Sequence, residues 1–208
     1  ADEGSTTSQT ITITDNESAP TVTLATSATS IAENAGSSLT LTATLSVATT
    51  ADVTVGISTS GTGTEGTDYS TISDITISAG ATTGTSSFTP TDDSVYEGNE
   101  TGIVAISTVS GGSATEDGTQ SVTITITENE SSPTVTLATS ATSIAENSGS
   151  TLTLTATISQ AADEDVTVNL GAAGTSTNGT DYGSISSITI SAGATTGTAT
   201  FDPTDDSV

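Results

Sequence analysis

The chain repeats itself every 113 residues, and any fold assigned to it must fit that period. When the 208-residue sequence is shifted by 113 positions, residues 1–95 align with residues 114–208 without a gap, and 68 positions are identical. Pro20 meets Pro133 and Phe88 meets Phe201 in this alignment. Self-similarity at a fixed period indicates that one structural unit is repeated in tandem.

The phase of the repeat divides the chain into three parts. Residues 1–18 correspond to the last strand of a preceding repeat, and residues 19–131 form one complete repeat. Residues 132–208 correspond to the first strands of a following repeat, which is incomplete because nothing in it matches residues 96–112. We therefore expect this chain to be a segment of a longer array, or one period of a polymer.

Apolar and hydroxyl residues alternate along much of the repeat, which predicts β-strands. Residues 152–158 read Leu-Thr-Leu-Thr-Ala-Thr-Ile, and residues 122–126 read Val-Thr-Ile-Thr-Ile. Alternation with period two is typical of strands with one buried face, although low hydrophobicity with high net charge would by itself suggest disorder. The predicted strands of the complete repeat are residues 21–31, 38–46, 52–59, 72–78, 84–90, 102–110 and 120–128.

Seven short strands without any helical period favour an immunoglobulin-like sandwich. The predicted fold is therefore all-β, with tandem seven-stranded antiparallel immunoglobulin-like β-sandwiches. Rings such as Tyr69 and Phe88 are few, so we expect them to plug the ends of the sandwich or to pack under its loops. The expected core is thin and aliphatic, and consists of Val22, Leu24, Ile31, Leu39, Leu41, Leu45, Val53, Val55, Ile75, Ile77, Val104, Ile106, Val122, Ile124 and Ile126.

Composition excludes most chemistry. The chain has no Lys, Arg, His or Cys, and its 25 acidic residues give a formal net charge of −25. Without His, Cys or Lys there is no common nucleophile and base pair and no soft ligand for zinc or copper. Nucleic acid is an unsuitable partner, because phosphate binding depends on Lys and Arg. Cations from solution must therefore compensate the acids.

The sequence contains no candidate membrane span. A spanning helix needs roughly 20 consecutive apolar residues, and no run in this chain approaches that length. An anionic membrane surface would also repel so acidic a chain. We expect any export signal to lie outside these residues.

The acidic residues gather in predicted turns, and eight positions of the first copy meet an acid in the second. By contrast Glu65 meets Asn178 and Asp74 meets Ser187, so we interpret these two as solvated surface residues. The recurring pairs are Glu3 with Glu116, Asp15 with Glu128, Glu17 with Glu130, Glu33 with Glu146, Asp52 with Asp165, Asp68 with Asp181, Asp92 with Asp205, and Asp93 with Asp206.

Alternate loops of a seven-stranded antiparallel sandwich fall at the same end, which predicts a convergence of acids. Carboxylates crowded within one Debye length, with no basic residue nearby, repel one another unless hard cations lie between them. Six to eight oxygen ligands are what Ca²⁺ prefers. The acids expected to converge at this end are Glu33, Asp68, Asp92, Asp93, Glu97, Glu100, Glu128 and Glu130.

Four segments of the repeat, taken in order, resemble the Calx-β domain of sodium-calcium exchangers, integrin β4 and many bacterial surface proteins. Ile31-Ala32-Glu33-Asn34-Ala35-Gly36 is the first segment and Gly66-Thr67-Asp68-Tyr69 is the second. The third runs from Asp92 to Thr101 as Asp-Asp-Ser-Val-Tyr-Glu-Gly-Asn-Glu-Thr. The fourth runs from Val122 to Glu130 and ends in Glu-Asn-Glu. The resemblance covers the full repeat.

This resemblance implies a set of calcium ligands in each repeat. In calcium-binding members of the family, the matching acids of these segments hold the ions. For the complete repeat the implied ligands are Glu33, Asp68, Asp92, Asp93, Glu97, Glu100, Glu128 and Glu130. For the following repeat they are Glu146, Asp181, Asp205 and Asp206. Asp15 and Glu17 would close the site of the preceding repeat.

The acids allow two other interpretations. A solvated acidic surface, as in proteins adapted to high salt, would spread acids over the exposed strand faces, but those faces carry Thr and Ser. A glycosidase would need a cleft and aromatic platforms beside its two carboxylates, and a narrow sandwich poor in rings favours neither. We therefore expect a protein that is not an enzyme.

The linker between repeats bears on the function. It is only Ser131-Ser132-Pro133, and Glu128 and Glu130 lie directly before it, so an ion bound there would stiffen the joint. We expect a calcium-binding spacer in an extracellular bacterial surface protein or adhesin. One alternative is a subunit of a self-assembling extracellular filament, polymerised head to tail by strand exchange between identical subunits. A calcium-sensing regulatory module ranks below both.

Overall fold

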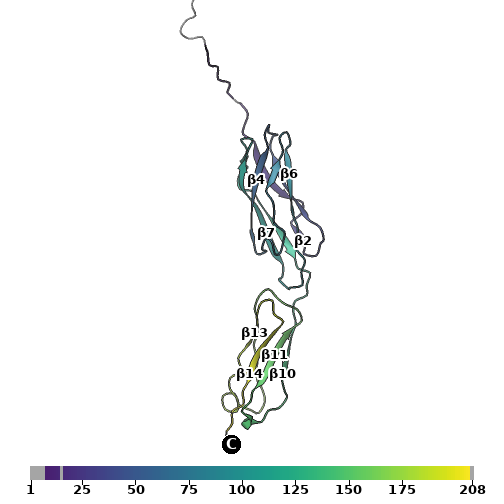
Figure 1. Cartoon of the computed structure of the whole chain (residues 1–208), viewed down its shortest axis with the longest axis vertical. Coiled ribbons are helices and arrows are strands. Elements are labelled where there is room, and N and C mark those ends of the chain that lie inside the picture. Colours follow the sequence, from purple (N-terminus) through teal and green to yellow (C-terminus); the bar gives the residue numbers. More distant parts are fainter. Residues whose placement is uncertain (1–7, 15, 207–208) are drawn as a thin grey trace, which may run out of the picture.

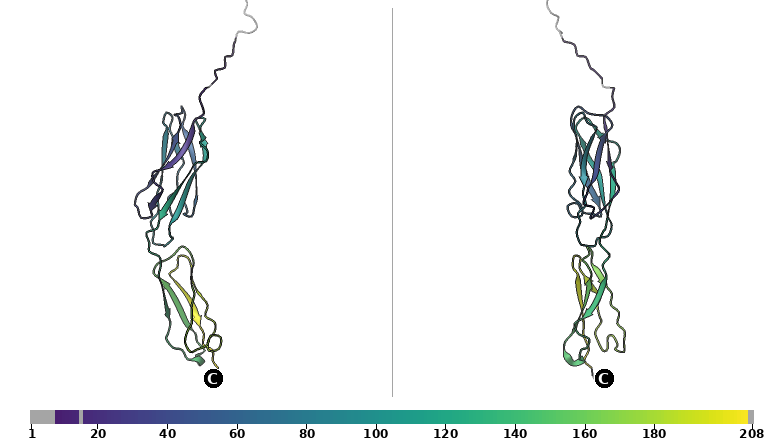
Figure 2. Two further views of the ribbon diagram at one scale, coloured as in Figure 1. Left: turned by 180° about the vertical axis from the view of Figure 1, so that it is seen from behind. Right: turned by 90° about the vertical axis from the view of Figure 1, so that its right-hand side faces the viewer.

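The computed structural model describes residues 8–14 and 16–206, and within that range it places two sandwiches end to end. The first comprises β1 to β9 and the second comprises β10 to β14. They follow one another along the long axis, and the segment before Pro20 extends beyond the first sandwich (Figure 1). Both further views in Figure 2 show the same elongated arrangement.

The first repeat consists of two sheets that face each other. The four-stranded sheet has the order β6-β3-β1-β8, and the five-stranded sheet has the order β2-β9-β7-β4-β5. The strands are β1 (Thr21–Thr26), β2 (Ser30–Ala32), β3 (Leu39–Leu45), β4 (Val53–Gly61), β5 (Ile75–Ile77), β6 (Thr83–Phe88), β7 (Glu100–Ser110), β8 (Thr115–Glu116) and β9 (Ser121–Thr127). The all-β sandwich fold expected from the sequence is confirmed.

The predicted first strand is in fact two strands in different sheets. β1 pairs with β3, whereas β2 crosses over and pairs in parallel with β9. The break between them is held by local hydrogen bonds, because the Thr26 hydroxyl donates to the Ala28 carbonyl at 2.9 Å and the Ser27 hydroxyl accepts from the Thr40 amide at 3.0 Å. Such side-chain bonds compete with a strand ladder. The short strand β8, which pairs in parallel with β1, was also not predicted.

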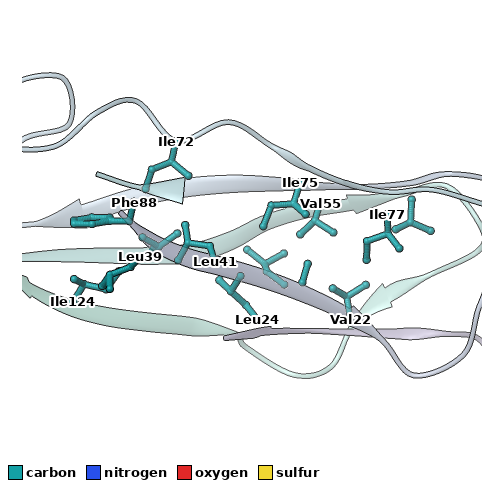
Figure 3. Packing of buried hydrophobic residues seen from close by; sticks show 14 of the residues in the cluster. Val22, Leu24, Leu39, Leu41, Val55, Ile72, Ile75, Ile77, Phe88 and Ile124 are labelled. Carbon is teal, nitrogen blue, oxygen red and sulfur yellow. The ribbon is translucent and has the colours of Figure 1, made fainter. Parts of the chain in front are cut away.

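Apolar side chains from both sheets fill the space between them, as the close-up in Figure 3 shows. Val22 and Leu41 come from one sheet and Val55, Ile75 and Ile124 from the other. Of the expected core residues, only Val122 is partly rather than fully buried. The alternation of apolar and hydroxyl residues therefore identified the core correctly, since only the apolar set of each strand faces inward.

Two rings close the core beneath the acidic end. Tyr69 and Phe88 are both buried, and they stack with ring centroids 4.6 Å apart. Gly102 of β7 lies directly against them, because a Cβ atom at that position would approach Cε2 of Phe88 to 2.6 Å. Tyr182 and Phe201 form the same stacked pair in the second repeat, with centroids 4.9 Å apart.

Gly102→Ala should destabilise the first repeat by about 1–3 kcal/mol, because the new methyl group displaces the packed Phe88 ring. Chemical denaturation would measure this loss. Gly171→Ala is the matched control, since no atom lies within 4 Å of the added Cβ and its backbone is not in the left-handed region. Equal stability of the two variants would contradict the close packing at Gly102.

The second repeat forms fewer and shorter strands. They are β10 (Val135–Thr139), β11 (Leu152–Ile158), β12 (Val166–Val168), β13 (Ile188–Ile190) and β14 (Thr196–Phe201), with a short 3-10 turn η1 at Glu146–Ser148. β12 matches β4 in sequence but is shorter, and it spans only the residues that pair with β13. In the first repeat the remaining residues of β4 pair with β7, which has no counterpart among the described residues of the second repeat. No described residue of the second repeat matches β7 or β9.

The segment before the first repeat is described as extended chain. Residues 8–14 form no strand, and their match to the last strand of a repeat stays a sequence prediction. No helix among the described residues is long and apolar enough to cross a membrane.

Candidate metal centre

Six acids converge at the end of the first repeat that faces the second. Three come from the strand ends of the five-stranded sheet: Glu33 follows β2, Glu100 opens β7 and Glu128 follows β9. The others are Asp68 and Glu97, which lie in the loops after β4 and before β7, and Glu130, which leads into the linker. They form two groups, and the carboxylate oxygens within each group lie within 4.8 Å of one another.

The first group, here the Glu33 trio, consists of Glu33, Glu128 and Glu130. The parallel pairing of β2 with β9 brings two of its members together, because the Glu33 amide continues that ladder by donating to the Thr127 carbonyl at 3.0 Å. The Glu33 side chain is only 5% exposed, and one of its oxygens accepts from the Asp93 amide at 3.1 Å. A carboxylate this deeply buried needs compensation.

Glu128 organises the loop that follows β6. One of its oxygens accepts from the amides of Glu97 and Gly98 at 2.7 and 2.8 Å, and the other accepts from the amide of Glu130 at 3.0 Å. Gly98 has φ 76°, a left-handed conformation that suits glycine and turns both amides toward the same carboxylate. The side chain of Glu128 thus joins the end of β9 to the loop that precedes β7.

The second group, here the Asp68 trio, consists of Asp68, Glu97 and Glu100. Asp68 is 8% exposed and accepts a hydrogen bond from the Thr64 amide at 2.5 Å, which closes the turn before it. Glu100 lies beside it, and one carboxylate oxygen of each lies within 4.8 Å of the other.

Burial, followed by the repulsion between neighbouring carboxylates, raises the pKa of several of these acids. Burial, and then the charges of Asp68 and its neighbours, raises the pKa of Glu97 and that of Glu100 to about 7. Burial is also the main cause of the raised pKa of Glu33. These carboxylates are therefore poised to exchange protons for a metal ion.

Glu128 and Glu130 titrate as a pair. A side-chain hydrogen bond between them raises the pKa of Glu130 to about 7. Burial opposes ionisation of Glu128, but the hydrogen bonds from Glu130, Glu97 and Gly98 outweigh it and lower the pKa of Glu128 to about 2. The pair therefore binds its first proton as the pH falls through about 7.

The residues present fit a hard cation. The sequence contains no Lys, Arg or His, so no side chain can neutralise either trio. Oε2 of Glu130 is buried and has no hydrogen-bond partner. Oxygens bound to one Ca²⁺ at about 2.4 Å lie at most about 4.8 Å apart, and the oxygens of each trio lie within that limit of one another. Oxygen-only carboxylate ligands match calcium better than any softer metal.

Asp92 and Asp93 border the two trios without joining them. The Asp93 carboxylate accepts from the Val95 amide at 2.7 Å, and its charge raises the pKa of Glu97. Asp92 is exposed, and its charge raises the pKa of Glu130. The eight acids expected to converge therefore lie at one end of the sandwich, and their role as ligands stays a prediction.

The second repeat reproduces part of this arrangement. The Asp206 amide donates to the Glu146 carboxylate at 2.8 Å, as the Asp93 amide donates to Glu33 in the first repeat. Glu146, Asp181 and Asp206 all line one cavity of about 590 Å³. Asp205 is exposed. Neither described group of three carboxylates lies in this repeat, whose residues 132–206 hold no counterparts of Glu97, Glu100, Glu128 and Glu130.

The two remaining sequence-predicted ligands precede the first repeat. Glu17 lies on the exposed segment before β1. Asp15 lies outside the described residues.

Two acids interpreted as solvated surface prove to be structural. Glu65 is half-buried and accepts from the Thr59 hydroxyl and the Ile72 amide, both at 2.7 Å. Asp74 accepts from the Ile57 amide at 3.0 Å, at the point where the register of β4 shifts. The interpretation as solvated surface was wrong for Glu65, whereas Asp74 is exposed as expected and also serves a backbone amide that has left the strand ladder.

One recurring acid pair also serves the backbone. Asp52 accepts from the Ala79 amide and Asp165 accepts from the Ala192 amide, each at 2.8 Å. Recurrence at the repeat period therefore marks structural acids as well as members of the two trios.

Comparisons with known proteins agree with this arrangement. The Calx-beta domain family model matches residues 15–130 and residues 128–208. No curated protein matches the chain.

Similar solved structures include the apo-form Calx CBD1 domain, at 17% identity and a TM-score of 0.44, covering 53% of this chain and 99% of that one. CBD12 from CALX1.2 is 17% identical with a TM-score of 0.43, and covers 86% of this chain and 73% of that one. The calcium binding domain CBD12 of CALX1.1 is 16% identical with a TM-score of 0.42, and covers 85% of this chain and 73% of that one.

The family matches account for nearly the whole chain, and the sandwich fold with its two acidic trios is consistent with them. Calx-beta domains bind Ca²⁺ and are typically non-catalytic. This chain belongs to the Calx-beta domain family and contains two such domains in tandem.

Proposed function

We propose that this chain is a non-enzymatic, calcium-stiffened rod or spacer in an extracellular bacterial surface protein that takes part in adhesion. The observation that carries the proposal is the position of the two acidic trios. Both lie at the end of the first repeat that faces the second, in a chain without a basic side chain. Above neutral pH, where these carboxylates lose their protons, their charge is balanced only by cations from solution.

The residues of the trios would hold calcium by replacing its hydration shell. Calcium supplies positive charge and takes six to eight oxygen ligands without changing oxidation state. Glu128 already fixes the Glu97 loop through two backbone amides, so this side of the centre is preorganised. Glu97 and Glu100 must lose their protons to bind, which their raised pKa values allow near neutral pH.

The joint between the repeats is built to be short. Only Ser131, Ser132 and Pro133 connect the Glu33 trio to the second repeat, and proline restricts the backbone further. Tyr96, next to Glu97, also pairs with the second repeat, since its amide donates to the Ala161 carbonyl at 2.9 Å. Calcium binding that fixes the loop of Glu97 would therefore also fix the contact between Tyr96 and the second repeat.

An extracellular location is part of the proposal. Calcium sites of extracellular modules bind at about 10⁻⁴–10⁻³ M, which suits fluids where the ion is abundant. Near-identical tandem copies suit a spacer, because such units add length without adding a new binding surface.

A specific observation favours a filament as the second candidate. Residues 8–14 read Ser-Gln-Thr-Ile-Thr-Ile-Thr and match β9 at six of seven positions, yet Ile11 and Ile13 are 87% and 92% exposed. In β9 the matching Ile124 and Ile126 are 0% and 4% exposed. The second repeat, for its part, has the open cavity of about 590 Å³, lined by Leu152, Leu154, Tyr182 and Phe201 among others.

In this alternative the segment 8–14 of one subunit fills part of that cavity in the next subunit. It would pair beside residues 143–145, as β9 pairs beside β2. Addition of a strand to an open sheet is a known mode of protein association. Calcium would act on the joints of either a spacer or a filament.

X-ray scattering and sedimentation of the 208-residue chain test both candidates. For the spacer we expect monomers at all concentrations. They should be rigid and extended in millimolar calcium, and flexible in chelator, where the mean radius of gyration should be lower. Identical scattering with and without calcium would contradict the stiffened rod. Growth of the particle with concentration would favour the filament, provided that Ile11→Asp with Ile13→Asp abolishes it.

A further inference from the structure

Tyr96 joins the first repeat to the second through its main chain. It lies between β6 and β7, and its amide donates to the Ala161 carbonyl at 2.9 Å. The Asp163 amide in turn donates to the Tyr96 carbonyl at 3.3 Å. Tyr96 is thus bonded on both sides of Ala162, as in a parallel strand pair, and this contact is here called the Tyr96 bridge. Two bonds to one residue fix both its place and its direction along the second repeat.

Both sides of the Tyr96 bridge are anchored in their own repeat. On the first repeat, the two amides that follow Tyr96, those of Glu97 and Gly98, donate to the Glu128 carboxylate at 2.7 and 2.8 Å. On the second repeat, Ala162 is buried, and its carbonyl accepts from the Gly193 amide at 2.8 Å. The bridge therefore connects two segments that are already held, and not two free loops.

Tyr96 also lies at the end of the apolar core of the second repeat. The residue is half-buried, and it lines a cavity of about 350 Å³ in the joint. Ile158 and Val166 line the same cavity, together with Pro133 of the linker. Ile158 is a core residue of the second repeat, and Val166 packs against that core. A tyrosine ring beside apolar side chains adds a hydrophobic contribution to the contact.

The internal repeat shows that the accepting segment 161–163 is preformed. Its match in the first repeat is residues 48–50, and the loop is closed there in the same way, because the Gly80 amide donates to the Thr49 carbonyl at 2.8 Å. Val47, next to this segment, is 52% exposed. The residue that matches it, Gln160 beside Ala161, is half-buried. The segment is therefore held by its own repeat, and contact with a neighbouring repeat covers it.

The Tyr96 bridge differs in kind from the acidic centre. Both of its hydrogen bonds join main-chain groups, so it uses no carboxylate of either trio. When a segment pairs with the edge of another unit in this way, main-chain bonds give affinity and side-chain pockets give specificity. Here the pocket is apolar, and the small residues Ala161 and Ala162 let the two backbones approach each other.

We propose that Tyr96 is the docking residue that sets the orientation of the following repeat, and that its partner is the preformed segment 161–163 of that repeat. Main-chain pairing and the apolar packing of the ring produce this docking. The inference does not rest on the proposed calcium binding, because neither hydrogen bond of the bridge involves an acidic side chain.

Distances between spin labels on the whole chain test this docking. The chain has no Cys, so Thr40→Cys with Thr153→Cys places one label on each repeat, at exposed positions of β3 and β11. A second pair, Thr76→Cys with Thr189→Cys, uses exposed positions of β5 and β13 in the other sheets. In millimolar calcium we expect narrow distance distributions for both pairs in the parent chain.

Two variants remove different parts of the contact. Tyr96→Ala removes the ring, and Asp163→Pro removes the amide that donates to the Tyr96 carbonyl. Both should lose the narrow distributions in calcium, while calorimetric titration shows unchanged calcium binding. Asp163→Ala is the control for the acidic side chain and should behave as the parent chain, because it keeps the amide. Thr50→Pro is the control for proline in this loop, since it makes the same change at the matching position of the first repeat.

The outcomes separate the docking from the proposed function. Parent-like distributions in both Tyr96→Ala and Asp163→Pro, or broad distributions of the parent chain in calcium, would refute docking by Tyr96. Loss of calcium binding in Tyr96→Ala would refute it as well, since the residue would then act through the acidic centre. Narrow distributions of the parent chain in chelator as well as in calcium would contradict stiffening by calcium and would support the Tyr96 bridge.

Discussion

Removal of calcium should lower the melting temperature of the first repeat by about 20 °C. A site with a dissociation constant of about 10⁻⁴ M gains about 2.7 kcal/mol at a hundredfold excess of free ion. Two ions, one for each trio, therefore add about 5 kcal/mol, and each kcal/mol shifts the melting temperature of a domain of this size by about 4 °C. Calorimetric scans in 10 mM calcium and in chelator measure the difference.

Two variants separate the trios from other acids in this experiment. Glu100→Gln removes a member of the Asp68 trio and should lose about half of the calcium response, while raising stability in chelator because repulsion is relieved. Glu65→Ala should lower stability by about 1–3 kcal/mol in both buffers, since it strands the Ile72 amide, and should leave the calcium response intact. Equal midpoints of the parent chain in calcium and chelator would rule out stabilisation by calcium.

Without calcium, the first repeat should become more stable as the pH falls from 8 to 5.5. Glu97, Glu100 and Glu130 have folded pKa values of about 7, above the ordinary 4.5, and that of Glu33 is raised as well. Between pH 4.5 and 7 the folded chain therefore binds more protons than the unfolded chain, and the free energy of unfolding decreases as the pH rises. After allowance for solvent screening, Glu97 and Glu100 each account for about 1 kcal/mol of this decrease in the free energy of unfolding.

Glu128 sets the lower limit of this window. Its pKa of about 2 lies below the ordinary value, so its contribution is present above pH 4.5 and is lost as the pH falls further. In calcium the trend should reverse between pH 8 and 5.5, because protons compete with the ion for the same carboxylates. Melting temperatures at several pH values, in calcium and in chelator, measure both slopes.

The double variant Glu97→Gln with Glu100→Gln is the control for the pH experiment. It removes two of the groups with raised pKa and should flatten the slope in chelator. Loss of stability of the parent chain between pH 8 and 5.5 in chelator would show that the carboxylates do not repel one another as the structure indicates.

Strand periodicity and the 113-residue repeat were enough to predict the sandwich and its core. Apolar residues alternate regularly along β3 and β9, so the buried face could be identified without the structure. The crossover between β1 and β2 could not, because nothing in the alternation shows that the chain changes sheets near Ser27. The shortness of β12 also depends on a partner strand far along the sequence.

The acidic centre was predictable in outline, because recurring acids in turns at one end of a sandwich must meet. The division into two trios was not, since it depends on which oxygens the backbone amides of Glu97, Gly98 and Thr64 occupy. Glu65 was misinterpreted because its structural hydrogen bonds leave no trace in the sequence.

Anomalous diffraction from crystals of this chain grown in calcium is the most direct test of metal at the joint. The two trios predict anomalous peaks among Glu33, Glu128 and Glu130, and among Asp68, Glu97 and Glu100. Ordered carboxylates at that end without any anomalous peak between them would contradict calcium binding by this chain.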